Sequence, residues 1–405
     1  MRWLVALDEF EADGTISRDQ AAAMKRRARA DMAAFGINTV YVAGIVAVTL
    51  GAILWTSGPL GLTLAGLLIF GAGAAGVARF GERLRVPAHA AVVIGLALTI
   101  WGVGWFAAEN FSSRMPQILI GGFATAAGLR ARILLPDRFA FAAGMAAVAG
   151  LSLHLWGLLT AQPSLDLDWL AMLYAGVAVL ALGLWLDVRA LSALSIAFFA
   201  SALSTTAYSG ANYSVTIYES TLTIAQFALI AGLCLLTTRF EVERWSRHAR
   251  IVGLLAFVWI NVAFWIGSLW GDWVGAHLWG PNRADFFAEI QGQPYEEAAW
   301  EAAHAQAAAA WEAFSATALE IPAAAFSIMW ALLLLGTALW AALTDRRSIF
   351  NAAATFGAIH FYTQWFETFE DEPSALIAAG VIAIALAWGA RAANRRFAER
   401  HARAS

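Results

Sequence analysis

Twelve apolar segments, each long enough to cross a lipid bilayer as a helix, dominate this sequence. About 20 consecutive apolar residues in an α-helix cover a hydrocarbon core of about 30 Å. The pattern therefore predicts an all-α fold, a polytopic transmembrane helix bundle of about 12 spans. The predicted spans are 36–56, 58–78, 86–107, 115–130, 138–160, 167–186, 189–208, 218–238, 249–270, 321–344, 348–366 and 374–391.

The composition excludes an ordinary soluble protein. Of the 405 residues, 60% are hydrophobic and only 14% are charged, whereas soluble domains have about 25% charged residues. The single cysteine, Cys234, lies within an apolar segment, so neither an intramolecular disulfide nor a thiolate metal cluster is expected. The first 35 residues contain no apolar core followed by a cleavage site, so no cleaved signal peptide is expected.

The basic residues alternate along the chain and thereby predict its orientation. With the N-terminus inside, 24 of the 26 Lys and Arg residues fall on the inner side, and only Arg114 and Arg283 fall outside. Of the 29 acidic residues, 16 fall outside. Because cytoplasmic loops carry an excess of Lys and Arg, this count predicts twelve spans with both termini in the cytoplasm.

The same reading divides the chain into five regions. Residues 1–35 are predicted to form a cytoplasmic helical segment, in which Ser17 and Gln20 have the spacing of a helix capping box. Spans one to nine and spans ten to twelve are separated by a long polar loop. The regions are 1–35, the spans of 36–270, the external loop 271–320, the spans of 321–393, and a basic cytoplasmic tail, 394–405.

The external loop is acidic and contains a predicted helix over 295–315. Its Ala- and Glu-rich composition favours a helix, and its aromatic residues repeat at helical spacing to form a narrow apolar seam. A seam of this kind must pack against lipid or against the ends of the spans, so we expect an external lid or docking surface. The candidate residues are Trp300, His304, Trp311, Phe314 and the loop's single arginine, Arg283.

A second group of candidates consists of polar side chains within or beside the spans. Their spacing places several of them on common helix faces that lead to the predicted outer surface. Two interpretations stay open, interhelical hydrogen bonding and the lining of an outward-facing polar cavity. The candidates are Asn261, Ser268 and Asp272, then His360, Gln364 and Glu367, and finally His154.

Motifs for catalysis or cofactors are absent from the sequence. It has no phosphate loop, nucleotide fingerprint, metalloprotease helix or nucleophile elbow. A lone histidine beside one carboxylate makes a poor metal site, so no cofactor and no metal are expected. The basic turns follow from membrane topology, so no nucleic acid partner is expected either. The middle of each span lacks Asp, Glu, Lys and Arg, which argues against a proton antiporter.

Two short turns are similar to each other. Asp187-Val188-Arg189 precedes the seventh span and Asp345-Arg346-Arg347 precedes the eleventh, and each Asp is followed by a Phe at the same offset. The similarity is consistent with an internal duplication or simply with two basic cytoplasmic turns.

Two further stretches resemble the bacterial multi-pass membrane proteins of the domain of unknown function 2157 family. The first is Asp13-Gly14-Thr15-Ile16-Ser17-Arg18-Asp19-Gln20-Ala21, and the second is Arg347 and Asn351 followed by Trp365-Phe366-Glu367-Thr368-Phe369. Gln364 stands where that family has an Arg. The resemblance implies a multi-pass protein of the bacterial cytoplasmic, or inner, membrane and brings no activity with it.

Three functions are compatible with these observations. The first is a non-enzymatic integral membrane protein, an envelope-associated accessory or sensor, whose partners are the lipid bilayer and an envelope protein or lipid. The second is a transporter of a small solute or lipid through an outward-facing polar cavity. The third is a lipid- or glycan-modifying enzyme, because the layout is similar to that of O-antigen ligases, with Arg283, His277 and His304 of the external loop as candidate residues.

Overall fold

The structure is a computed structural model of the 405-residue chain. It describes residues 10, 14–24, 26, 40–49, 51, 58–80, 85–161, 168–203, 205–208, 214–240, 242–287, 290, 296–344, 346–368, 377, 381 and 389. Most of the predicted span 374–391, most of the predicted segment 1–35 and all of the predicted tail 394–405 lie outside these residues.

Long apolar helices make up most of the described chain. Seven of the described helices are long and apolar enough to cross a membrane, which is consistent with the predicted all-α polytopic membrane protein. Each begins within six residues of a predicted span. The seven are α3 (Pro59–Phe80), α4 (Arg85–Asn110), α6 (Ala140–Thr160), α7 (Asp168–Leu186), α9 (Ser220–Thr237), α10 (Glu243–Trp270) and α13 (Ala323–Leu343).

Three more helices occupy predicted spans but are shorter or more polar. α5 (Met115–Leu134) contains Arg130 and Arg132, α8 (Arg189–Leu203) has only 15 residues, and α14 (Arg347–Thr368) carries several polar side chains. The predicted number of twelve spans therefore stays a prediction. The N-terminal capping box is confirmed, because Ser17 N donates to Gln20 Oε1 at 2.9 Å and Gln20 N donates to Ser17 Oγ at 3.2 Å.

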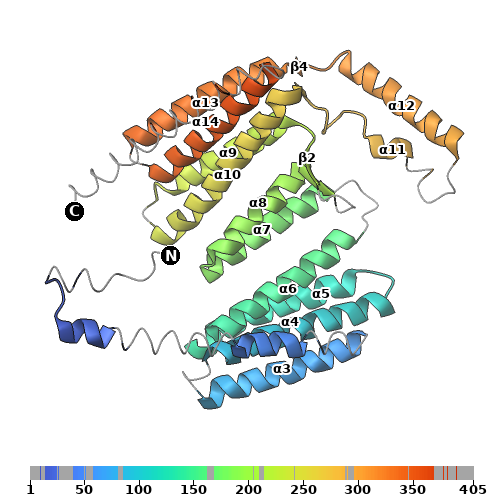
Figure 1. The fold of residues 1–405 in the computed structure, drawn as a ribbon. Coiled ribbons are helices and arrows are strands. Elements are labelled where there is room, and N and C mark those ends of the chain that lie inside the picture. The colour runs from blue at the N-terminus through green and yellow to red at the C-terminus, as the bar shows by residue number, and fades with distance from the viewer. Residues whose placement is uncertain are drawn as a thin grey trace. The chain divides into compact units, whose positions relative to one another are not determined.

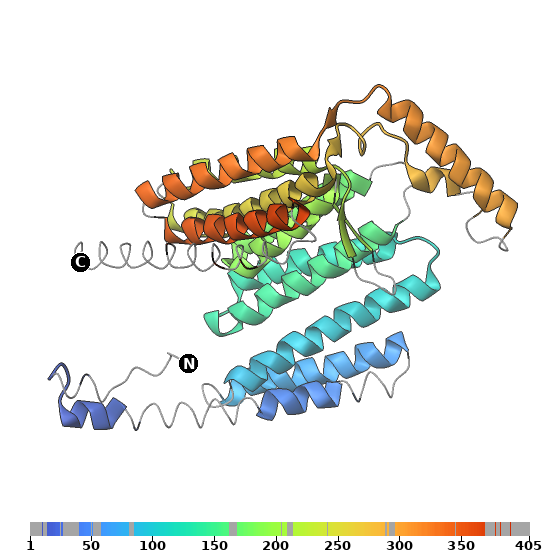
Figure 2. The same cartoon turned by 45° about the horizontal axis from the view of Figure 1, so that its top comes forward.

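Contacts divide the chain into two units, Met1–Ser164 and Leu165–Ser405. The N-terminal unit consists mainly of two antiparallel hairpins, α3–α4 and α5–α6, whose helices lie side by side in Figures 1 and 2. Glycines seven residues apart let the paired backbones touch. They are Gly66 and Gly73 in α3, Gly95 and Gly102 in α4, Gly121 and Gly128 in α5, and Gly150 and Gly157 in α6.

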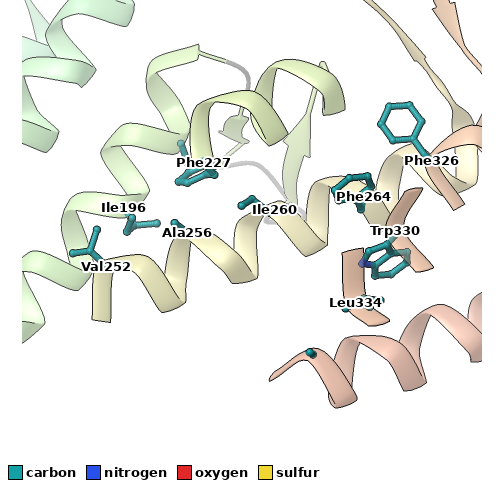
Figure 3. Close-up of a cluster of buried hydrophobic side chains, with 11 residues drawn as sticks. Ile196, Phe227, Val252, Ala256, Ile260, Phe264, Phe326, Trp330 and Leu334 are labelled. Atoms are coloured by element: carbon teal, nitrogen blue, oxygen red, sulfur yellow. The ribbon is translucent and has the colours of Figure 1, made fainter. Parts of the chain in front are cut away.

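The C-terminal unit contains three consecutive helix pairs, α7–α8, α9–α10 and α13–α14. α10 is the longest of these helices and the one around which they are organised, since it contacts α7, α8, α9, α13 and α14 (Figure 1). A buried cluster of large apolar side chains fills the space along α10 (Figure 3). The largest members are Ile196 of α8, Phe227 of α9, Ile260 and Phe264 of α10, and Phe326, Trp330 and Leu334 of α13.

Two short β-ladders interrupt the helical pattern. The helix predicted over 189–208 ends at Leu203, and β1 (Thr205–Tyr208) then pairs with β2 (Ser214–Ile217). The prediction was wrong at this point because Thr-Thr and Ser-Val-Thr-Ile flank Gly210 and Asn212, and such β-branched residues around a turn favour a hairpin. An apolar count alone does not separate this pattern from the end of a helix.

The second ladder closes the long polar loop. β3 (Asp272–Trp273) pairs with β4 (Glu320–Ile321), so that Asp272 lies opposite Ile321, and Val274 N donates to Leu319 O at 3.0 Å. Between the strands, the loop forms α11 (Arg283–Phe287) and α12 (Glu297–Ser315). The helix expected over 295–315 is thus present, beginning two residues later.

Candidate functional site

A large cavity lies within the C-terminal unit. Its volume is about 1130 Å³, and it is lined by α9, α10 and α13 together with the first residues of α8 and α14. Along α10 its lining extends from Arg247 to Phe264, about 25 Å of helix at about 1.5 Å per residue. The wall is mainly apolar and includes Ala231 and Cys234 of α9, Leu254 and Phe257 of α10, and Leu333 and Trp340 of α13.

Arginines collect at one end of this cavity. Five of its described lining residues are arginines, and the described lining contains no acidic side chain. They come from three separate parts of the chain, the α7–α8 turn, the first turns of α10, and the α13–α14 turn. The five are Arg189, Arg247, Arg250, Arg346 and Arg347.

Several of these arginines already have partners. Arg247 is ion-paired with Asp187 at 2.9 Å, Arg346 lies over the ring of Trp340 at 4.9 Å, and Arg250 lies 4.0 Å from Glu243. A guanidinium group has five donor hydrogens, so each of these contacts leaves donors for an additional acceptor. The Nε of Arg247 has no hydrogen-bond partner among the described residues.

Asp187 organises the turn between α7 and α8. It adopts a left-handed backbone conformation with φ of 57°, which most residues other than Gly avoid. Asp187 N bonds to Leu184 O and Val188 N bonds to Gly183 O, the pattern of a Schellman motif that ends a helix. Its carboxylate forms hydrogen bonds with His248 and Arg247 of α10, so contacts with α10 stabilise the strained turn.

The hydrogen bond from His248, together with the charges of Arg247, His248 and Arg244, lowers the pKa of Asp187, although desolvation opposes this shift. Asp187 is therefore ionised near neutral pH and can hold both basic partners. Arg244 adds donors to the carbonyls of Leu184 and Trp185. The α7–α8 turn is thus tied to the first turns of α10 by two kinds of polar contact.

Ser192, His248 and Asp187 form a hydrogen-bonded chain like that of a serine hydrolase triad. Ser192 Oγ lies 2.7 Å from His248 Nδ1, and His248 Nε2 lies 2.9 Å from Asp187 Oδ1. A catalytic serine must reach its substrate, but both Ser192 and His248 are buried, with exposures of 0% and 1%. The chain of bonds therefore fastens α8 to α10, and it offers no accessible nucleophile.

Two buried carboxylates join the opposite end of α9 and α10 to the polar loop. Glu219, immediately before α9, accepts from Gly275 N at 2.8 Å and from His277 N at 3.0 Å. Asp272 accepts from Thr221 N at 2.6 Å and from Trp273 N at 3.0 Å. Each carboxylate thus satisfies backbone donors that the turns and the α9 N-terminus would otherwise leave unpaired.

His277, one of the candidate residues for an enzymatic function, lies beside the Glu219 carboxylate. Its ring stacks on Tyr218 with centroids 5.9 Å apart. Burial lowers its pKa, while the neighbouring Glu219 carboxylate acts in the opposite direction.

Asn261 and His360 converge on one tryptophan in the interior of the C-terminal unit. Trp330 Nε1 donates to Asn261 Oδ1 at 2.8 Å, and Asn261 Nδ2 donates to Phe257 O at 2.7 Å. The ring of His360 meets that of Trp330 edge-on at 4.7 Å. These contacts match the interhelical hydrogen-bonding interpretation of Asn261, and neither Asn261 nor His360 is among the described lining residues of the cavity.

The other polar candidates make hydrogen bonds within their own helix or, for His154, to a neighbouring helix, and they are likewise not among the described lining residues. Ser268 Oγ donates to Trp265 O at 2.7 Å, and Gln364 Nε2 lies 3.5 Å from Glu367 Oε2. In the N-terminal unit, His154 Nδ1 lies 2.8 Å from Ile118 O, which links α6 to α5.

The aromatic seam of α12 packs partly on α11. Phe287 contacts Trp300 at a centroid distance of 5.3 Å and His304 at 4.9 Å. Farther along, Trp311 contacts Phe314 of its own helix at 5.5 Å and remains 40% exposed. Arg283 begins α11; its side chain lies outside the described part of the chain.

Sequence reasoning missed the arginine cluster, the Asp187 network and Glu219. A signal for the first was present, because the two similar turns both carry arginine before a span. Glu219 and Asp187 looked like ordinary loop acids, since their partners are 56 to 61 residues away in sequence.

No family model matches this chain, and no curated protein and no solved structure shows significant similarity to it. The resemblance of its two motifs to the domain of unknown function 2157 family stays a prediction. The functional argument therefore depends on the cavity and the side chains around it.

Proposed function

We propose that this protein is a non-enzymatic integral protein of the bacterial cytoplasmic membrane that binds a lipid among its C-terminal helices. The cavity of about 1130 Å³ carries the proposal. It exceeds the range of about 300–1,000 Å³ that is usual for small-molecule pockets. Its length along α10, about 25 Å, approaches the thickness of the hydrocarbon core, about 30 Å.

The chemistry of the wall favours an acyl chain over a polar solute. A hydroxyl or amide transferred into an apolar site without a hydrogen-bond partner costs about 1–3 kcal/mol, and the wall formed by Ala231, Leu254 and Leu333 offers no such partner. An acyl chain loses no hydrogen bonds on entering. A lipid is therefore the ligand class that the cavity suits.

The proposed topology places the arginine end of the cavity at the cytoplasmic side. The excess of Lys and Arg in alternate turns supports twelve spans with both termini in the cytoplasm. In this arrangement the loop 271–320 lies outside the cytoplasm, and α12 with its aromatic seam is available as a lid or docking surface.

A lipid transporter is the second candidate, favoured by the same cavity because its lining continues along most of α10. It differs from the first in one measurable property. Reconstituted protein would move a fluorescent lipid between leaflets, whereas an accessory protein would bind the lipid without raising its rate of transfer.

A cavity-filling substitution tests the proposal. Ala231→Trp places a large ring in the cavity, whereas Leu229→Trp adds a ring on the same helix at a side chain that is 65% exposed. A phospholipid with a photoreactive acyl chain should cross-link to α9, α10 and α13 in wild type and Leu229→Trp, and several-fold less in Ala231→Trp. Equal cross-linking in all three proteins would refute binding in this cavity.

A further inference from the structure

We infer that the ligand of this cavity is an anionic phospholipid whose phosphate is bound between the arginine-bearing N-termini of α8 and α14. This inference rests on the proposed lipid-binding function and adds the chemistry of the headgroup. Arg189 is the first residue of α8 and Arg347 is the first residue of α14, and both line the cavity.

The positions of these two arginines conflict with an ordinary rule of helix stability. The N-terminus of a helix carries a partial positive charge, so acidic residues are favoured there and basic residues are disfavoured. Neither α8 nor α14 has an acidic residue in its first turn. A bound anion would interact favourably with the guanidinium and with the helix N-terminus at both helices.

Membrane topology explains the sign of these charges but not where they meet. The positive-inside rule requires Lys and Arg on the cytoplasmic side, and exposed arginines also occur in the N-terminal unit, at Arg79 near the end of α3 and Arg130 near the end of α5. Five arginines of the C-terminal unit instead come from three separate parts of the chain and line one largely apolar cavity. Basic pockets between transmembrane helices on the cytoplasmic side are suited to anionic headgroups.

The two similar turns in the sequence thereby acquire a common role. Asp187-Val188-Arg189 and Asp345-Arg346-Arg347 each deliver an arginine to the cavity at the start of a helix. In the first turn, Asp187 holds Arg247 beside the cavity at 2.9 Å. In the second, the guanidinium of Arg346 lies 4.9 Å from the centre of the Trp340 ring, a cation–π contact.

The Ser348 hydroxyl and the apolar wall beside the arginines favour a phospholipid over a free anion. Ser348 lines the cavity together with the arginines and can donate to a phosphate oxygen, whereas the Thr238 hydroxyl already donates to Leu235 O at 2.7 Å. Ile251 and Ile349 line the same cavity and continue into the apolar wall. A free phosphate would use only the polar end, whereas a phospholipid uses both.

The test measures lipid preference with full-length protein in detergent. Phosphatidylglycerol and phosphatidylcholine with identical acyl chains, and glycerol 3-phosphate without chains, are titrated and followed by native mass spectrometry. The variants are Arg189→Gln/Arg347→Gln, the charge-retaining Arg189→Lys/Arg347→Lys, and the matched control Arg79→Gln/Arg130→Gln, which removes the same charge from the N-terminal unit.

Wild type should prefer phosphatidylglycerol over phosphatidylcholine by about tenfold or more. The Gln variant should lose most of this preference, because its affinity for phosphatidylglycerol falls more than its affinity for phosphatidylcholine, whereas the control and the Lys variant should keep most of the preference. Equal affinities of wild type for the two lipids, or an equal loss in the control, would overturn the inference. Tight binding of glycerol 3-phosphate would also overturn it in favour of a free anion.

These outcomes are distinguishable from failure of the proposed function itself. If phosphatidylcholine binding is unaffected by Ala231→Trp, the cavity does not hold the acyl chains and both proposals fall. If Ala231→Trp abolishes binding but the Arg189→Gln/Arg347→Gln variant keeps its lipid preference, only the headgroup assignment is wrong. Far-UV circular dichroism and gel filtration of each variant establish that it is folded.

Discussion

The helix hairpins of the N-terminal unit and the helices around α10 are packed by opposite means. In α3–α4 and α5–α6, glycines bring one backbone against another; a Cβ at Gly95 would lie 2.2 Å from Phe70 N. Around α10, large side chains such as Phe227, Phe326 and Trp330 separate the helices. Backbone contact leaves no volume for a ligand, whereas side-chain contact can leave a cavity beside the packed cluster.

The α7–α8 pair combines the two modes. α7 has its own glycines seven residues apart: Gly176 lies against the ring of Phe199, and Gly183 lies against both the side chain and the backbone N of Ser192. The pair is then fastened to α10 by the bonds of Asp187 and Ser192 to His248. Small residues thus allow α7 and α8 to pack closely, and hydrogen bonds connect this pair to the helices that line the cavity.

The largest effect is expected from removing the aromatic core. Trp330→Ala deletes a side chain that is 0% exposed and leaves Asn261 Oδ1 without its donor. Large-to-small changes of buried tryptophan cost about 3–5 kcal/mol. Denaturant unfolding in detergent should show a loss of that order, whereas Leu335→Ala, at a side chain 59% exposed on the same helix, should change little. Equal effects would mean that the aromatic cluster does not support the C-terminal unit.

The next largest effect is expected from adding one methyl group to a glycine contact. In Gly95→Ala the new Cβ would collide with the backbone of α3, and overpacking of this kind costs about 1–3 kcal/mol. Gly71→Ala places the same methyl group where nothing lies within 4 Å, and alanine then favours the helix by up to about 1 kcal/mol. Thermal unfolding should therefore shift in opposite directions. Shifts of the same sign would contradict backbone packing of α3–α4.

The smallest of the three effects is expected at the α7–α8 turn and depends on pH. The pKa of Asp187 is lowered from its ordinary value of 3.8 by its hydrogen bond to His248 and the charge of Arg247. For a lowered carboxyl pKa, the stabilisation is fully present above 3.8 and is lost as pH falls through the folded-state pKa.

Asp187→Asn, which tolerates the left-handed conformation, should therefore be less stable than wild type at neutral pH and converge with it as the solution is acidified. Thermal unfolding curves between neutral and acidic pH measure this convergence. Asp137→Asn, in the short 3-10 helix Asp137–Phe139 before α6, is the control that removes a charge without that network. A constant difference between Asp187→Asn and wild type at all pH values would show that the carboxylate charge is not what stabilises the turn.

Much of the architecture followed from local patterns in the sequence. The capping box of Ser17 and Gln20 and the helix near 295–315 depend on neighbours within a few residues, and both were predicted. The ladder of Thr205–Tyr208 with Ser214–Ile217 was missed, because its residues satisfy an apolar count as well as a strand pattern. Asn261 and Trp330 were not paired in the prediction, since residues 69 positions apart give no local signal.

The sequence by itself determined that the chain is rich in long apolar helices and that its basic residues recur in alternate turns. Both properties depend on the free energy of moving a short segment from water into lipid. That free energy is set by the segment's own residues, so it can be read from the sequence. Only the tertiary structure decided that Arg189 and Arg347 line one cavity and that His248 joins Ser192 to Asp187. Helix packing sets which turns meet and how much space remains between helices, and it depends on side chains far apart in sequence.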